Sequence, residues 1–156
     1  MIIILLVAIS LLYFILAAQF ESIIQPLIIL SEIVVDVFFV LLGLWLFGES
    51  LNIMSMIGLV VMSGIIINDS ILKVDTINRL RKQGMPVLKA VFAGGHSRLK
   101  PIIMTSLTTI LAIAPFLNRV DMGSDLQYPL SLSIIIGMTV GTLISLFFIP
   151  LIYYII

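Results

Sequence analysis

The sequence predicts an all-α membrane protein with five transmembrane helices and one short amphipathic helix at the cytoplasmic membrane surface. Three observations predict this fold. The 156 residues are 62% hydrophobic and only 10% charged, whereas soluble domains are about 45–50% apolar and about 25% charged. Five apolar runs reach the roughly 20 residues that a helix needs to cross a bilayer. Seven of the eight Lys and Arg residues fall within residues 73–100.

The five predicted spans end at proline, glycine or charged residues, which commonly mark helix boundaries. The opening run lacks the basic start and the small-residue cleavage site of a signal peptide, so we interpret it as a spanning helix. All spans belong to a single transmembrane domain, residues 1–156. They cover residues 2–20, 26–47, 53–75, 101–117 and 129–156.

The basic segment between the third and fourth spans sets the predicted topology. Short loops rich in Lys and Arg stay in the cytoplasm. The N-terminus and the loop at 119–128 are therefore expected outside the cell membrane and the C-terminus inside. Within the basic segment, residues 86–93 place apolar side chains at helical spacing, which predicts an amphipathic helix along the inner surface. These side chains are Val87, Leu88, Val91 and Phe92.

The last span repeats a small residue at every fourth position. In lipid, small residues allow helix backbones to approach closely. Glycine is also commoner in membrane helices than in soluble ones, so ordinary usage is the alternative, but four small residues in register favour a packing seam. The four residues are Ser133, Gly137, Gly141 and Ser145.

Two carboxylates, Glu32 and Asp36, lie within the second span. They are four residues apart and share one helix face, and Asp36 lies about 15 Å from Pro26, near the bilayer middle. Two like charges this close in a low dielectric do not easily both stay ionised. A carboxyl group that exchanges a proton near neutral pH is what a proton-coupled transporter needs. The alternative is that both are simply protonated, or hydrogen-bonded to neighbouring helices, without a transport role.

The end of the third span is also polar. Asn68 and Asp69 are expected inside the bilayer, in an intramembrane polar network. Lys73 is four residues after Asp69, so the two can pair along the helix, and Lys73 can extend to the inner interface. For Lys73 and the charged residues after it, the alternative is a solvated helix end.

The sequence contains none of the residue patterns that support catalysis or a cofactor. No phosphate-binding loop, metal-ligand cluster or nucleophile triad is visible, and the chain has no cysteine. We therefore predict neither an enzyme nor a cofactor site, and expect no nucleic acid among the partners. Thr105 in the fourth span could hold water or steer a proton, although threonine hydroxyls in helices commonly bond back to their own backbone.

Several motifs occur in an order that resembles the resistance–nodulation–division (RND) efflux transporters, in particular the acriflavine-resistance and heavy-metal branches. The specific run is the one at 98–106, and the resemblance covers essentially the whole chain. The motifs are FES at 20–22, NIMSMIG at 52–58, GIIINDSIL at 64–72, NRLR at 78–81, RLKPIIMTS at 98–106 and FIP at 148–150.

The resemblance implies that the five spans are helices eight to twelve of a twelve-helix pump in the bacterial inner membrane. Such pumps exchange protons for drugs, lipids or metal ions. The implied partners are membrane lipid, the N-terminal half and the periplasmic domains of the pump. In the full-length protein they also include two further copies in a homotrimer, a periplasmic adaptor and an outer-membrane channel.

The resemblance also implies positions for a proton relay. The family's lysine on the tenth helix falls on Asn68, its arginine ahead of the eleventh on Arg98, and its threonine on Thr105. Asn68 cannot carry a positive charge, and Glu32 and Asp36 occupy positions that are usually apolar or small in the drug exporters. Our hypothesis is that these two carboxylates, with Asn68 and Asp69, partly replace the usual charge pattern.

Two other functions compete with that of a pump fragment. An odd number of spans and a chain that starts directly inside a helix also fit a truncated, non-transporting membrane module or an assembly partner. A small channel is disfavoured, because no pore-lining repeat is visible. On the transporter interpretation, the chain is expected to be inactive alone.

Overall fold

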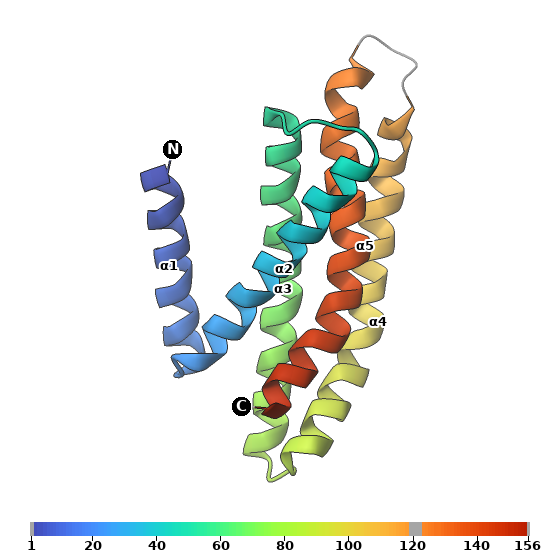
Figure 1. Ribbon diagram of the computed structural model, residues 1–156. Helices are drawn as coiled ribbons and strands as arrows, with labels where there is room; N and C mark the ends of the chain where they lie inside the picture. The colour runs from blue at the N-terminus through green and yellow to red at the C-terminus, as the bar shows by residue number, and fades with distance from the viewer. Residues whose placement is uncertain (1, 119–122, 156) are drawn as a thin grey trace.

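The computed structural model describes residues 2–118 and 123–155, and its regular elements are all helical (Figure 1). No strand occurs in these ranges. The predicted loop at 119–128 falls partly outside the described residues, because 119–122, including Arg119, are not among them. The elements are α1 (Ile2–Phe20), α2 (Ile24–Leu46), α3 (Ile53–Lys82), α4 (Val87–Ile113), the 3-10 turn η1 (Ala114–Leu117) and α5 (Ser124–Ile155).

Helix α5 is the centre of the bundle. It packs against α2, α3 and α4, and α3 packs in turn against α2 and α4. Helix α1 lies at the side and packs mainly against α2 (Figure 1). The contact between α3 and α5 is the most extensive one, so any group on the shared face of these two helices is far from the surface of the bundle.

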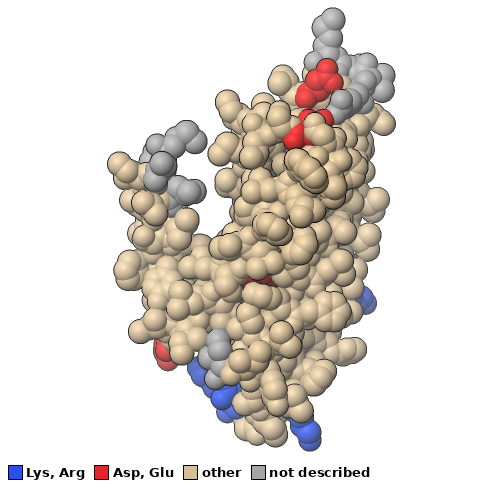
Figure 2. Space-filling view, viewed as in Figure 1, with Lys and Arg blue, Asp and Glu red and all other residues tan. Residues whose placement is uncertain are grey.

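The structure confirms an all-α membrane protein. Within the described part of the chain, four segments are long and apolar enough to cross a membrane: α2, α3, α4 continued by η1, and α5. In α1 the apolar stretch found there is Leu6–Phe20. On the face shown in Figure 2, most charged side chains lie near the ends of these apolar segments. In Figure 2, Lys and Arg gather toward the end where α3 turns into α4, while the broad middle carries almost no charge on this face.

Two helices are longer than the sequence predicts. Helix α3 continues to Lys82, beyond the predicted end at residue 75. Helix α4 starts at Val87 and runs through Pro101, so the segment 86–93 is the beginning of this helix and not a separate one. The prediction of a separate helix was wrong because it considered only the amphipathic pattern. The structure buries Ala90, Val91 and Gly94 within the bundle, and this packing keeps the segment in line with the rest of α4.

The turns between helices are defined by local hydrogen bonds. Both Gly48 and Gly84 have positive φ, +72° and +89°, where glycine is unstrained. Each follows a helix end at which two backbone N–H groups bond back to carbonyls of the last turn, the pattern of a Schellman motif. At the start of α3, Asn52 and Ser55 bond reciprocally to each other's backbone N–H as a capping box.

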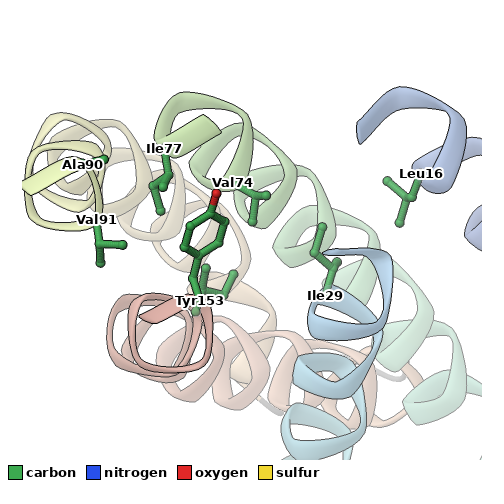
Figure 3. Packing of buried hydrophobic residues seen from close by; sticks show 8 residues of the cluster. Leu16, Ile29, Val74, Ile77, Ala90, Val91 and Tyr153 are labelled. Carbon is green, nitrogen blue, oxygen red and sulfur yellow. The ribbon is translucent and has the colours of Figure 1, made fainter. Parts of the chain in front are cut away.

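The buried apolar side chains form two clusters with a polar layer between them. In α2, α3 and α5, five buried polar residues fall in sequence between the residues of one cluster and those of the other: Glu32, Asp36, Ser70, Lys73 and Ser145. The first cluster lies toward the basic end (Figure 3) and contains Leu16, Ile29, Val74, Ile77, Ala90, Val91, Ile149 and Tyr153. The second contains Val40, Leu44, Met62, Ile66, Leu132, Ile134 and Met138.

The small residues of α5 lie where other helices approach most closely. Ser133, Gly137, Gly141 and Ser145 are all buried. A Cβ atom on Gly137 would overlap Met62, and one on Gly141 would overlap Ile66. From the α3 side, a Cβ on Gly58 would come within 2.9 Å of the Leu130 backbone oxygen. The small side chains therefore allow α3 to pack directly on the α5 backbone.

This packing predicts opposite outcomes for two alanine substitutions in α3. We expect Gly58→Ala to lower the free energy of unfolding by about 1–3 kcal/mol, because the new methyl group meets a backbone atom that cannot move aside. Gly64→Ala is the matched control. No atom lies within 4 Å of the Cβ position at Gly64, so this variant should be neutral or stabilised by up to about 1 kcal/mol. Unfolding in mixed micelles measures both; equal effects would contradict the packing described.

Candidate functional site

Glu32 and Asp36 are buried on the face of α2 that meets α3 and α5. Each side chain is only 1% exposed. The two carboxyl groups are near enough for their charges to interact, as their spacing of four residues requires. Helix α2 therefore brings two acidic groups into the apolar interior, where each needs a partner or a proton.

Lys73 of α3 reaches the same region from the other side. It is 0% exposed, and its ammonium Nζ donates to the backbone oxygen of Ser145 at 2.5 Å and to the Ser145 Oγ at 2.9 Å. The expectation that Lys73 extends to the inner interface was wrong. Its charge is held inside the bundle because the side chain of Ser145 is small and leaves an α5 carbonyl accessible.

A serine on α3 connects the lysine to the carboxylates. Ser70 Oγ donates to Glu32 Oε2 at 2.6 Å and lies 3.5 Å from Ser145 Oγ. Lys73 and Glu32 are also within range of electrostatic attraction. We call Glu32, Asp36, Ser70, Lys73 and Ser145 the buried charged group. It joins three helices through side chains that are all 2% exposed or less.

Three carboxyl oxygens of this group remain available. Glu32 Oε1 and both oxygens of Asp36 accept no hydrogen bond from the described part of the chain. Asp36 Oδ2 lies against α5, at the place where Gly141 lacks a side chain. Buried polar atoms normally have partners, so these oxygens are the positions in the group at which a proton can bind.

The structure places Asn68 and Asp69 apart from this group. Asn68 is exposed and Asp69 is half-buried, and neither side chain makes a hydrogen bond to the described residues. Asp69 remains within electrostatic range of Lys73 and Glu32, but the expected direct pair with Lys73 does not form: the only ion pair in the described ranges joins Arg79 and Asp75. The buried network is thus centred one turn further along α3 than the sequence predicted.

Arg98 and Thr105 are also outside the buried charged group. Arg98 is half-buried on α4, and its Nε donates to Thr76 Oγ1 of α3 at 2.8 Å. Thr105 is half-buried two turns further along α4 and donates to the Pro101 carbonyl of its own helix at 3.0 Å. Like Asn68 and Asp69, these two residues lie at exposed or half-buried positions of the bundle.

Sequence reasoning missed Ser70 and the central place of Lys73. A signal was present in the spacing, because the two residues continue a stripe on α3 that begins with small or apolar side chains three or four residues apart. All members of the stripe are buried in the structure. They are Gly58, Met62, Ile66, Ser70, Lys73 and Ile77.

The fold and the buried charged group define a class of protein, the multi-span membrane proteins that keep ionisable groups inside the bilayer. In that class such groups mark proton relays and substrate or ion pathways. The comparison with protein families is more specific. The model of the AcrB/AcrD/AcrF family matches residues 1–156. The chain belongs to this family of RND efflux transporters, and the resemblance seen in its motifs is confirmed.

Curated relatives agree with this assignment. The chain is 35% identical over 149 residues to the multidrug resistance protein MdtC of Erwinia amylovora, covering 95% of this chain and 15% of that protein. It is 30% identical over 149 residues to the swarming motility protein SwrC of Bacillus subtilis, covering 95% of this chain and 14% of the relative. The chain thus spans only a small part of the length of these relatives.

Solved structures show the same helix arrangement. A crystal structure of a heavy metal efflux pump matches with a TM-score of 0.88 and 29% identity, over 98% of this chain and 15% of that pump. A second crystal form of a heavy metal efflux pump matches with a TM-score of 0.82 and 28% identity, over 97% and 15% of the two chains.

Removal of the buried cation should destabilise the bundle. We expect Lys73→Met to lower the free energy of unfolding by about 3 kcal/mol, because it leaves the buried carboxyls without the nearby positive charge. Lys82→Met, on the exposed end of the same helix, should stay within about 0.5 kcal/mol of the wild type. Adding Glu32→Gln to Lys73→Met should recover part of the loss. A stable Lys73→Met variant, measured in micelles, would show that the ammonium balances no buried charge.

Proposed function

We propose that this chain is the C-terminal membrane part of a proton-driven RND efflux pump, which exchanges protons for substrate across the bacterial inner membrane. In this proposal α1 to α5 are helices eight to twelve of the pump. Family membership supports it, and so does the match of nearly the whole chain to about 15% of a heavy metal efflux pump and of a multidrug resistance protein. The substrate is selected by parts of the pump outside this chain.

The buried charged group is the observation that carries the proposal. Proton binding at Asp36 or at Glu32 Oε1, both without a hydrogen-bond donor in the described residues, removes one negative charge beside Lys73. Because Lys73 holds α3 to the Ser145 backbone of α5, a change in that charge alters the attraction between α2 and the α3–α5 pair. Proton exchange is thereby coupled to the packing of three helices.

The four polar residues outside the buried charged group have a different role in this proposal. Asn68, Asp69, Arg98 and Thr105 lie at exposed or half-buried positions of α3 and α4, where the N-terminal half of the pump would pack and complete the relay. Since Asn68 has no charge, the cation beside the carboxyls of α2 is Lys73, which belongs to the buried charged group.

The positive-inside pattern gives the proposed orientation. The N-terminus lies in the periplasm, and the basic end, where α3 meets α4, lies in the cytoplasm together with the C-terminus (Figure 2). The complete pump is proposed to be a homotrimer that works with a periplasmic adaptor and an outer-membrane channel, as members of its family do.

The proposal predicts that Asp36 is required for transport. In a complete pump carrying this segment, Asp36→Asn should abolish proton-coupled efflux, because an amide cannot exchange a proton, while the shape of the side chain is kept. The matched control is Asp125→Asn, at an exposed position in the first turn of α5, which should transport normally. Efflux by inside-out vesicles under a pH gradient measures both. Normal transport by Asp36→Asn at normal expression would remove Asp36 from the mechanism.

A second experiment separates a pump fragment from a non-transporting module. Co-expression of this chain with an N-terminal half of a related pump is expected to restore efflux, which neither part provides alone. The variant Asp69→Asn should weaken the restored transport, because Asp69 lies on the face proposed to meet the other half. If the two parts fail to associate when purified together, the chain is a membrane module without a transport role.

A further inference from the structure

A second polar cluster lies about two helical turns from the buried charged group, toward the basic end. Gln25 of α2 and Asn78 of α3 exchange two hydrogen bonds: Gln25 Nε2 donates to Asn78 Oδ1 at 3.0 Å, and Asn78 Nδ2 donates to Gln25 Oε1 at 2.7 Å. Tyr153 OH of α5 also donates to Asn78 Oδ1, at 2.5 Å. The same three helices that hold the buried charged group are therefore tied together a second time.

An arginine completes this cluster. Arg81 Nη1 donates to Tyr153 OH at 3.3 Å, and the guanidinium carbon lies 5.8 Å from the centre of the tyrosine ring. We call Gln25, Asn78, Arg81 and Tyr153 the inner polar cluster. The Tyr153 hydroxyl is its central atom, because it bonds to residues on two different turns of α3.

The inner polar cluster faces a polar pocket at the cytoplasmic end of the bundle. The pocket has a volume of about 530 Å³, enough for many water molecules at about 30 Å³ each. It contains acidic and basic side chains as well as amides. Its lining residues are Gln19, Phe20, Glu21, Ser22, Gln25, Asp75, Asn78, Arg81 and Lys82.

Only one apolar layer separates the two polar groups. Each helix contributes a fully buried residue to it, Ile29 from α2, Val74 from α3 and Ile149 from α5. Along α5 the order is Ser145, Ile149, Tyr153, and the eight steps along the helix from Ser145 to Tyr153 span about 12 Å at 1.5 Å per residue. Figure 3 shows the Tyr153 ring extending from α5 toward α3, beside Val74 and Ile77.

We propose that the inner polar cluster is the cytoplasmic gate of a proton route that connects the buried charged group to the polar pocket. The Tyr153 hydroxyl is the latch that holds α5 against α3, so that the apolar layer excludes water. When the latch opens, water enters the layer. A carboxyl oxygen of Glu32 then releases its proton to that water, and the hydronium ion leaves through the pocket, while the remaining carboxylate is balanced by Lys73. This gate rests on the proposed function.

The arrangement of donors and acceptors distinguishes a gate from ordinary packing. Three helices place amide and hydroxyl groups at one level, although apolar side chains would pack there without the need for mutual hydrogen bonds. The amide of Asn78 uses both its oxygen and its nitrogen in these bonds. Loss of the tyrosine hydroxyl alone therefore weakens the connection of α5 to α3 and leaves the aromatic packing in place.

Thiol labelling tests the latch directly. The 156 residues contain no cysteine, so in a complete pump whose other parts also carry none, Ile149→Cys is the single reactive thiol, and it lies in the apolar layer. With a small cationic methanethiosulfonate on the cytoplasmic side of vesicles that hold the complete pump, labelling should be slow. Adding Tyr153→Phe should accelerate it about tenfold, equivalent to about 1.4 kcal/mol in the opening equilibrium. An unchanged rate would overturn the proposal.

Two single-cysteine controls show whether a faster labelling rate at Ile149→Cys reports a local opening of the apolar layer. Lys82→Cys, at the exposed edge of the pocket, should label quickly with or without Tyr153→Phe, which establishes that this end faces the cytoplasm. Ile134→Cys, buried in the apolar cluster at the other end of α5, should stay slow in both backgrounds. If Tyr153→Phe accelerates Ile134→Cys equally, the substitution loosens the whole bundle and the gate is rejected.

Proton leak separates the gate from the proposed function. In the same vesicles without substrate, Tyr153→Phe should dissipate a pH gradient several-fold faster than the wild type, and adding Glu32→Gln and Asp36→Asn should remove this leak. A leak that persists without the carboxyls would refute a route through them. A pump that needs Asp36 for efflux but shows neither leak nor faster labelling in Tyr153→Phe would keep its proposed function and lose this gate.

Discussion

The contact between the Lys73 ammonium and Ser145 determines how the rest of this bundle is arranged. A fully buried cation in a membrane helix needs oxygen atoms around it, and the backbone carbonyl of Ser145 is the closest one. A helix carbonyl is accessible to a neighbouring lysine only if the side chain beside it is small. The small residues on α5 thus serve two purposes: they allow α3 to approach, and they leave room for its charge.

The carboxylates on α2 follow from the same constraint. Glu32 accepts a hydrogen bond from the Ser70 hydroxyl and is attracted electrostatically by Lys73. Asp36 faces α5 and has no hydrogen-bond donor among the described residues. Glu32 therefore has more of its hydrogen-bonding capacity satisfied than Asp36 does. Apolar clusters on both sides fix the depth of the buried charged group in the bundle. Such a group holds its helices together and can still respond to a proton.

Composition and spacing predicted most of the fold, because the bilayer permits few alternatives: apolar runs of sufficient length must be helices, and their ends are marked by proline, glycine and charge. The places of Glu32 and Asp36 inside the bundle followed from their depth in α2. The partner of Lys73 could not be predicted, since it is a backbone atom of a helix 72 residues away and depends on which faces meet. Segment 86–93 was misassigned for the same reason, as its packing on neighbouring helices is a tertiary property.

Energy coupling in this bundle requires that the buried carboxyls exchange a proton while Lys73 stays nearby. Infrared spectroscopy of the complete transporter in lipid, as the pH is stepped across neutrality, measures this directly. We expect a carboxylic acid C=O band that disappears as the pH rises and that is absent from the Glu32→Gln, Asp36→Asn double variant. If the wild type and the double variant show the same C=O bands at every pH, both carboxylates stay ionised in the bundle and exchange no proton.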